Sequence, residues 1–245
     1  MFIKGGFTIY GQEIGILMLD TIFPRISGDI GNAYTYKFPV RYKVVKGAQT
    51  DKIMGDEPDL NMLQFFIQAA QELEREGVKA ITTSCGFLAR FQKELAKAVS
   101  IPVFTSALIL VPLIRAMLNK EKKIAIFTER AHNLNESHFN GVGWSSKDIP
   151  VIIKGMKENA VFPSVFIGNR PELESEILKQ EMEEMARELM AEHPNTGAIV
   201  LECTNMGPFS ANVQAIAGVP VFGINNLFEL IHYAVRPPRF ETQRT

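Results

Sequence analysis

The feature that most constrains this chain is an internal repeat centred on its two cysteines. Residues 77–104 align with residues 195–222 without a gap, at a constant offset of 118 positions. Cys85 then falls on Cys203, and one Pro-Val-Phe triplet falls on a second. Matching residues on both sides of an ungapped window are hard to obtain by chance. The repeat therefore predicts a duplicated supersecondary unit.

Each copy of the repeat is typical of a βαβ unit, with a cysteine at the carboxyl end of its first strand. The same alternation of short apolar runs and amphipathic helices continues along the chain. The predicted strands are 14–19, 80–83, 103–105, 124–128, 151–153, 198–201 and 221–224, and the clearest predicted helices are 60–73 and 173–189. This pattern predicts an α/β fold with parallel sheets, whose active site lies at the carboxyl ends of the strands.

The duplication also predicts two like, pseudo-symmetric domains that face each other across a cleft. The first domain is expected to comprise residues 1–113 and 225–245, and the second residues 114–224. Leu227, Leu230 and Ile231 recur at helical spacing, so the segment after residue 224 is expected to return as a helix onto the first domain.

Charge and hydropathy exclude several classes of partner. The chain has 245 residues with 26 basic and 27 acidic side chains, so no overall field attracts a nucleic acid or an anionic membrane. No apolar run approaches the roughly 18 residues of a membrane span, and the N-terminus does not resemble a secretory signal. We therefore expect a cytoplasmic chain with a small-molecule carboxylate substrate and no nucleic-acid or membrane partner. A homodimer is compatible with the sequence.

The two cysteines point to acid/base chemistry. At a strand end each thiol meets backbone N–H groups and the positive terminus of the following helix, which should lower its pKa from about 8.5 toward neutrality. Two such thiols flanking one carbon next to a carboxylate can remove a proton from one face and return one on the other. Two alternatives stay open, namely ordinary buried core cysteines and a non-catalytic protein that binds a small acid.

Polar residues after the apolar strands are further candidates for substrate binding. Arg25 precedes a Gly-rich loop containing Asn32, and two roles stay open for its guanidinium, namely paired hydrogen bonds to a substrate carboxylate or an ordinary position on the surface. Thr128 ends the strand 124–128, where its hydroxyl is placed to contact substrate or to cap a helix.

The cysteine motifs resemble those of the aspartate/glutamate/hydantoin racemase superfamily, which includes arylmalonate decarboxylases and maleate isomerases. The motifs are Thr83-Ser84-Cys85-Gly86-Phe87 and Glu202-Cys203-Thr204-Asn205-Met206. The resemblance implies one catalytic cysteine from each domain, Cys85 and Cys203, and no cofactor or metal. The other substrate-binding candidates that it suggests are Ser84, Gly86, Phe87, Thr204 and Asn205. Asp20-Thr21 is similar to an Asp-Ser pair of glutamate racemases, whose acid assists the nearby cysteine.

Departures from the glutamate racemase pattern limit the substrate. Those enzymes carry Cys-Asn-Thr and Cys-Thr-His, whereas this chain has Cys85-Gly86-Phe87 and Cys203-Thr204-Asn205. Cys-Thr-Asn is closer to the maleate isomerase and decarboxylase branch, although its decarboxylases keep one cysteine. We therefore predict a cofactor-independent racemase or epimerase of an amino acid or a related carboxylate or hydantoin. A cis-trans isomerase or a decarboxylase of the same fold is the alternative.

Overall fold

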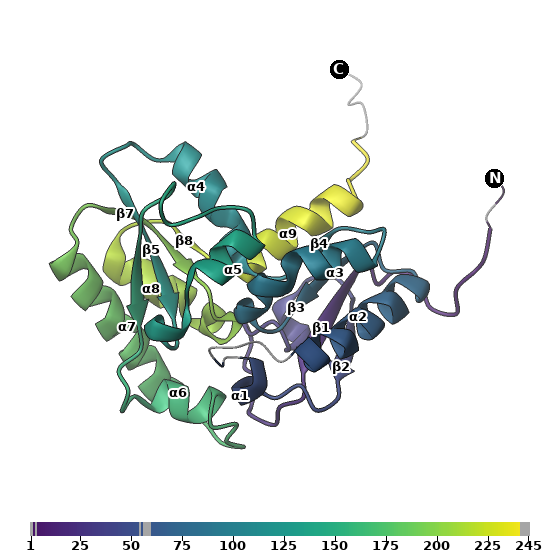
Figure 1. The fold of residues 1–245 in the computed structure, drawn as a ribbon, viewed down its shortest axis with the longest axis horizontal. Helices are drawn as coiled ribbons and strands as arrows, with labels where there is room; N and C mark the ends of the chain where they lie inside the picture. The colour runs from purple at the N-terminus through teal and green to yellow at the C-terminus, as the bar shows by residue number, and fades with distance from the viewer. Residues whose placement is uncertain (1, 3, 54, 56–59, 241–245) are drawn as a thin grey trace.

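A computed structural model describes residues 2, 4–53, 55 and 60–240 of the chain. These residues form two parallel four-stranded sheets, with the strand orders β2-β1-β3-β4 and β6-β5-β7-β8. The sheets lie in two halves of the molecule, each with helices packed around it (Figure 1). Because the strand order of the first sheet recurs in the second, the predicted duplicated α/β fold is confirmed.

The first sheet is built from the first part of the chain, in which η denotes a short 3-10 helix. Its elements are β1 (Ile14–Leu19), η1 (Ala33–Thr35), β2 (Val40–Val45), α1 (Thr50–Ile53), α2 (Leu60–Arg75), β3 (Ala80–Thr83), η2 (Gly86–Phe91), α3 (Gln92–Ala98) and β4 (Val103–Phe104). Every residue of β1 and β3 is buried, which explains why both strands are continuous apolar or threonine-containing runs in the sequence.

The second sheet and its helices follow. Their elements are η3 (Ala107–Leu110), α4 (Val111–Met117), β5 (Lys123–Thr128), η4 (Ala131–Asn133), α5 (Glu136–Gly141), β6 (Val151–Gly155), α6 (Val161–Phe166), α7 (Ser175–Glu192), β7 (Thr196–Leu201), η5 (Thr204–Phe209), α8 (Ser210–Ala217), β8 (Val221–Phe222) and α9 (Ile224–Val235). The strand predicted over 221–224 ends early because the Asn226 side chain accepts a hydrogen bond from the Gly223 N–H and starts α9 there.

Strand β2 is absent from the sequence-based prediction. It lies at the edge of the first sheet and is mostly half-buried, so its charged residues interrupt any apolar run. Arg41 pairs with Glu76 at 2.6 Å, and Lys43 pairs with Glu72 of α2. These pairs show why a strand can carry charges here, since the side chains reach partners at the end of the neighbouring helix.

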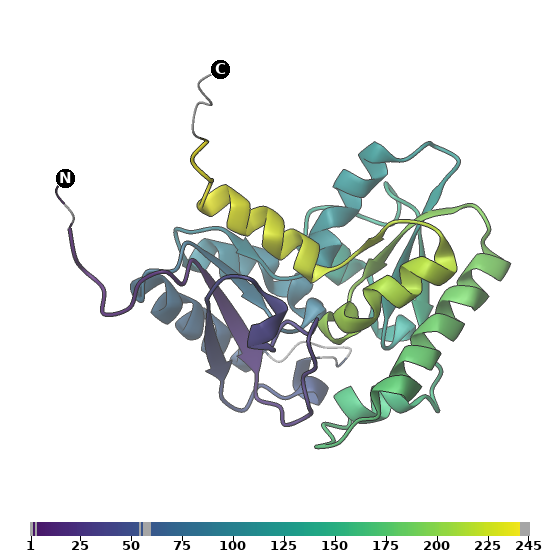
Figure 2. The same ribbon diagram turned by 180° about the vertical axis from the view of Figure 1, so that it is seen from behind.

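Helix α9 joins the last strand of the second sheet to the first half of the molecule (Figure 2). Its Phe228 is fully buried and stacks on Tyr36 with ring centroids 4.1 Å apart, and it also contacts Phe38 and Phe104. The exact division of the chain into domains at about residue 113 stays a prediction.

Within the described ranges, none of the helices combines the length and apolar character that a bilayer crossing requires.

Candidate functional site

The two cysteines occupy equivalent positions in the two halves. Cys85 follows β3 at the N-cap position of η2, and Cys203 follows β7 at the N-cap position of η5, so both lie at the carboxyl edges of their sheets. Both thiols are free, and both line one small pocket. The pocket is lined by Leu19, Phe23, Thr50, Ser84, Cys85, Gly86, Phe87, Glu129, Glu202, Cys203, Thr204 and Asn205. Residues from both sheets therefore build a single site.

The Cys203 thiol has a carboxylate partner. Its Sγ donates to Glu129 Oε1 at 3.0 Å, and Asn205 Oδ1 is a second acceptor 3.5 Å from the same sulfur. Glu129 directly follows β5, the strand beside β7 in the sheet. This arrangement places a proton acceptor in contact with the thiol, as acid/base work requires.

A second carboxylate, Glu202, lies between the two cysteine loops. The Thr128 hydroxyl donates to its Oε2 at 2.7 Å. A Cβ on Gly86 would lie 2.2 Å from Glu202 Oε1 and 2.3 Å from its carbonyl oxygen. Only glycine therefore fits next to Cys85, because any side chain there would displace the carboxylate.

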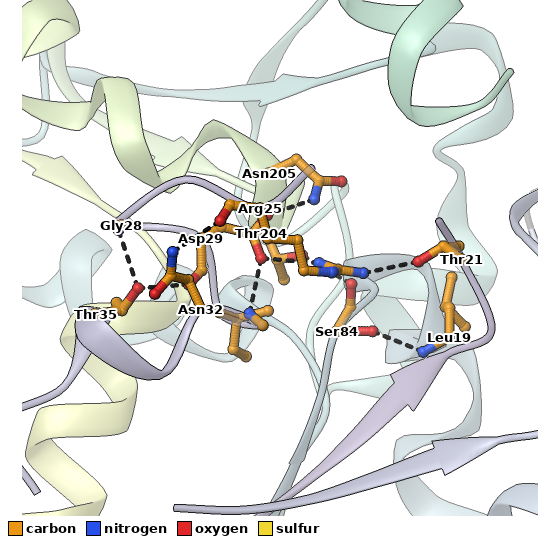
Figure 3. A network of polar contacts seen from close by, with 12 residues as sticks. Leu19, Thr21, Arg25, Gly28, Asp29, Asn32, Thr35, Ser84, Thr204 and Asn205 are labelled. Carbon is orange, nitrogen blue, oxygen red and sulfur yellow. Dashed lines mark hydrogen bonds and ion pairs between the residues drawn. The ribbon is translucent and has the colours of Figure 1, made fainter. Parts of the chain in front are cut away.

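Hydrogen bonds hold the two halves together around the pocket (Figure 3). The Thr204 hydroxyl donates to the Ser84 carbonyl oxygen at 2.8 Å, and the Ser84 hydroxyl accepts from the Leu19 N–H at 2.9 Å. Asn205 Nδ2 donates to Asp29 Oδ2 at 2.7 Å. These bonds connect the loop after β7 to the loops after β1 and β3, so the relative position of the two thiols is constrained.

The expected lowering of the thiol pKa values is wrong. Burial, and next the charge of Glu202, raise the pKa of Cys85 to about 12, although the Phe87 and Leu88 N–H groups act in the opposite direction. Burial followed by the charges of Glu129 and Glu202 holds the pKa of Cys203 well above its usual range. The sequence argument counted the helix termini but neither the desolvation nor the carboxylates.

The two carboxylates are perturbed in the same sense. Burial raises the pKa of Glu129 to about 7, against the effect of the Cys203 hydrogen bond. Burial, opposed by the Thr128 hydrogen bond and assisted by the charge of Glu129, raises the pKa of Glu202 to about 8. Two acids that titrate near neutral pH therefore lie beside the two thiols, a pattern found at functional sites.

The structure brings together most of the residues singled out in the two cysteine motifs. Ser84, Gly86, Phe87, Thr204 and Asn205 all line the pocket with the thiols. Asp20, Thr21, Arg25, Asn32 and Thr128 do not line it. The role of each of these residues in binding substrate stays a prediction.

The residues outside the pocket wall have other partners. Arg25 forms an ion pair with Asp29 at 2.8 Å and donates to the Thr21 hydroxyl at 3.0 Å (Figure 3), so its guanidinium is already engaged. Asn32 caps η1 and donates to the Arg25 carbonyl oxygen. Asp20 accepts a hydrogen bond from the Gly47 N–H at 3.0 Å, where it organises the turn after β2 instead of contacting a cysteine.

Sequence reasoning missed Leu19, Phe23, Thr50, Glu129 and Glu202 as pocket residues. A usable signal existed for the two glutamates, since each directly follows a buried strand and so lies at the same sheet edge as the cysteines. Thr50 belongs to the four-residue helix α1 and Phe23 to a loop, where no pattern in the sequence indicates a pocket.

The raised pKa values predict a pH-dependent stability. The folded-state pKa of Glu202 is about 8 and its ordinary value 4.5, so its contribution is fully present below pH 4.5 and is lost as the pH rises through 8. Through this group the wild type should lose about 4 kcal/mol of unfolding free energy between pH 5 and 9, and Glu202→Gln, which lacks the ionisable group, should not show this loss. Urea unfolding at several pH values measures this. Glu158→Gln, which changes an exposed glutamate, is the control. Parallel pH profiles for wild type and Glu202→Gln would contradict the prediction.

Comparison with solved structures supports the superfamily resemblance at the level of the fold. An aspartate racemase from Picrophilus torridus superposes with a TM-score of 0.57, at 13% identity, over 94% of this chain and 97% of the racemase. An arylmalonate decarboxylase superposes with a TM-score of 0.55, at 14% identity, over 93% and 96% of the two chains. The fold that the resemblance to the aspartate/glutamate/hydantoin racemase superfamily implied is therefore confirmed. No protein-family model matches the chain.

Sequence comparison identifies nearer relatives. A dimethylsulfoniopropionate lyase of Durusdinium sp. clade D is 32% identical over 216 residues, which are 86% of this chain and 70% of the lyase. Dimethylsulfoniopropionate lyase 7 of Emiliania huxleyi is 30% identical over 238 residues, with coverages of 93% and 69%. The chain spans only 56% of the length of lyase 3 from the same organism.

These relatives overturn the predicted racemase function. Two racemases that share the fold are 13% and 15% identical to this chain, whereas relatives that align over most of the chain at about twice that identity are lyases. The predicted enzymatic character is supported, but the isomerase class is not. With a lyase 32% identical over 70% of its own length, the chain belongs to the dimethylsulfoniopropionate lyase family.

Proposed function

We propose that this protein is a dimethylsulfoniopropionate lyase that eliminates dimethyl sulfide from its substrate and leaves acrylate. The observation that carries the proposal is the thiol and carboxylate pair of Cys203 and Glu129, in contact at 3.0 Å within a chain of this lyase family. The pair supplies a base for removing a proton, which is the step that a carboxylate substrate with a leaving group on its β-carbon requires.

The elimination balances with one base. The base takes a proton from the α-carbon, next to the substrate carboxylate, and the C–H electron pair forms the double bond between the α- and β-carbons. The bond between the β-carbon and sulfur breaks, and its electron pair leaves with the sulfur. The sulfonium becomes neutral dimethyl sulfide, so the leaving group needs no proton.

We assign the base to Cys203. Its thiol already donates to Glu129, which is therefore placed to take the thiol proton and later pass it to solvent, and a pKa raised to about 7 makes this carboxylate a better proton acceptor than an ordinary glutamate. Cys85 is more buried and has no hydrogen bond to a carboxylate among the contacts of the described residues. In this assignment Cys85 shapes the opposite wall of the pocket and touches the substrate without being the base.

Backbone N–H groups at the starts of η2 and η5 are the proposed partners of the substrate carboxylate, with Thr204 beside them. Both segments begin at the pocket, directly after the two cysteines. Donors in this position also stabilise the charge that develops on the carboxylate as the α-proton leaves. The predicted proton removal next to a carboxylate is thus retained, and only the return of a second proton is given up.

A panel of substrates tests the proposal. Purified protein is expected to release dimethyl sulfide and acrylate in equal amounts from dimethylsulfoniopropionate, as measured by headspace gas chromatography and NMR. Arylmalonate and maleate serve as comparison substrates, because a decarboxylase and a cis-trans isomerase were the alternatives from the sequence. Turnover of either compound without release of dimethyl sulfide would reject the lyase in favour of that alternative.

A further inference from the structure

Two carboxylate oxygens in the pocket lack hydrogen-bond partners. Glu129 Oε2 and Glu202 Oε1 are buried, and no group of the described chain donates to either oxygen. Their residues are 3% and 1% exposed, so water does not replace the missing partners over most of the side chain. Burying an unpaired carboxylate oxygen is costly, and such oxygens indicate that a group absent from the free protein completes the site.

No basic side chain balances these acids from within the pocket. Among the described residues, neither lysine, arginine nor histidine lines its wall. Arg130 acts on Glu129 only at longer range, with an effect on its pKa weaker than burial and the Cys203 hydrogen bond. The rest of the wall that the two acids face includes the apolar side chains of Leu19, Phe23 and Phe87. Two acids in an apolar pocket without a cation form a site that favours a cationic ligand with an apolar surface.

We propose that Glu129 and Glu202 recognise the onium group of the substrate and so select carboxylates with a cationic leaving group on the β-carbon. This inference rests on the proposed function, because it names the part of the substrate that these two acids contact. It assigns Glu129 a second role beside that of accepting the Cys203 proton, and it gives Glu202 its only contact with substrate.

The spacing of the groups agrees with this assignment. In the substrate, the sulfonium sulfur is bonded to the carbon next to the one that loses its proton. In the protein, the carboxylate of Glu129 is in contact with the thiol assigned as base, at 3.0 Å. A thiol that touches the α-carbon therefore brings the free oxygen of Glu129 close to the sulfonium. Leu19 and Phe23 are then available to contact its methyl groups.

The electrostatics favour the same ligand. A cation between two carboxylates of low exposure interacts more strongly than it does in water, because the local dielectric constant is lower. Burial raises the pKa values of Glu129 and Glu202 to about 7 and 8 because it disfavours their charged forms. An entering cation offsets this cost, since it favours the ionised carboxylates. A neutral ligand of the same shape offers no such compensation, and its carboxylate is repelled by both acids.

A pair of ligands with the same shape tests the inference in the wild-type protein. One ligand, called the cationic ligand for its trimethylammonio group, is zwitterionic β-trimethylammonio-propanoate. The other, called the neutral isostere, has an uncharged tert-butyl group in place of the trimethylammonio group, and both ligands keep the carboxylate. Isothermal titration at pH 8 is expected to show that the cationic ligand binds at least about tenfold more tightly than the neutral isostere. A chelator keeps metal ions away from the two acids, and measuring trimethylamine release shows whether the ligand is cleaved during the titration. Equal binding of the two ligands, or binding of neither, would overturn the inference.

Two variants connect the preference to the named acids. Glu129→Gln and Glu202→Gln should each reduce the affinity for the cationic ligand by at least about threefold, and should not weaken binding of the neutral isostere, whose carboxylate the acids repel. Glu158→Gln, at an exposed position, is the matched control and should bind both ligands as the wild type does. A preference that persists in both pocket variants overturns the assignment even if the wild type discriminates. If Glu129→Gln does not fold, Glu129→Asp is measured in its place. Because Asp keeps the charge, this variant should still bind the cationic ligand more tightly than the neutral isostere.

Failure of this inference is distinguishable from failure of the proposed lyase function. If the protein releases dimethyl sulfide but shows no preference for the cationic ligand, the onium site is rejected and the lyase function stands. If the protein does not cleave dimethylsulfoniopropionate but prefers the cationic ligand, and this preference depends on Glu129 or Glu202, the onium site stands and the lyase function is rejected.

Discussion

Replacing Cys203 by serine is expected to lower kcat/KM for the elimination by about 10²- to 10⁴-fold, the range typical of losing a general base. A hydroxyl is far less acidic than a thiol, so the Glu129 carboxylate that contacts Cys203 cannot produce an effective base from serine near neutral pH. Binding of β-trimethylammonio-propanoate should change little, because its onium group is assigned to the two acids and its carboxylate to backbone N–H groups. Steady-state release of dimethyl sulfide and titration with this ligand measure the two effects.

Cys85→Ser is the matched variant for this prediction. Both cysteines occupy the N-cap position of a 3-10 helix and line the same pocket, so the two substitutions are alike in size and position. Elimination needs a single base, and the loss in Cys85→Ser is therefore expected to be smaller than in Cys203→Ser. The opposite order would assign the base to Cys85, and equal losses would favour a mechanism in which both thiols transfer protons. Thermal unfolding of each variant shows whether a loss comes from misfolding.

Phe228→Ala should lower the free energy of unfolding by about 3 to 5 kcal/mol, the usual cost of truncating a buried phenylalanine. The ring is fully buried and lies 4.1 Å from the ring of Tyr36, with Phe38 and Phe104 also against it. These contacts join α9, at the end of the chain, to β4 and to the segment between β1 and β2. Removing the ring leaves a cavity between parts of the chain that are distant in sequence.

Urea unfolding of wild type and Phe228→Ala at one pH measures this loss. Leu230→Ala is the control, since Leu230 is on the same helix and 52% exposed, and its replacement should cost less than about 1 kcal/mol. Phe228 packs on Tyr36, whose hydroxyl donates to Asn225, and Asn225 in turn donates to the Gly28 carbonyl oxygen. The activity of folded Phe228→Ala therefore reports whether this chain of contacts to the Gly28 loop matters for the site. Similar stabilities for the two variants would show that α9 does not hold the first half in place.

Much of the fold follows from the sequence because the central strands are buried on both faces. Strands β1, β3, β5 and β7 are nearly continuous apolar runs, and their residues, apart from Lys123 of β5, are buried in the structure. A buried parallel strand must be apolar along its whole length, so the run itself marks the element. Strand β2 lacks this constraint because it is a half-exposed edge strand, and its alternating charges concealed it.

The cysteine motifs did not predict the lyase activity that the relatives suggest. The cysteine pair and its strand ends are shared by racemases, decarboxylases and isomerases of one fold, so they indicate proton transfer without defining the bond that breaks. That choice depends on what the rest of the pocket recognises. The two acids proposed for this recognition, Glu129 and Glu202, directly follow different strands, and Glu129 contacts Cys203 whereas the charge of Glu202 raises the pKa of Cys85.

By itself, the sequence determined the duplication, the parallel α/β architecture and the convergence of two cysteines on one pocket, because these depend on local patterns repeated along the chain. Tertiary structure alone decided the environment of the thiols. Glu129 meets Cys203, and Thr128 meets Glu202, across 74 positions of sequence in each case, and burial then raises the pKa of both acids and both thiols. Desolvation and charge coupling depend on distances between strands, which no local pattern contains.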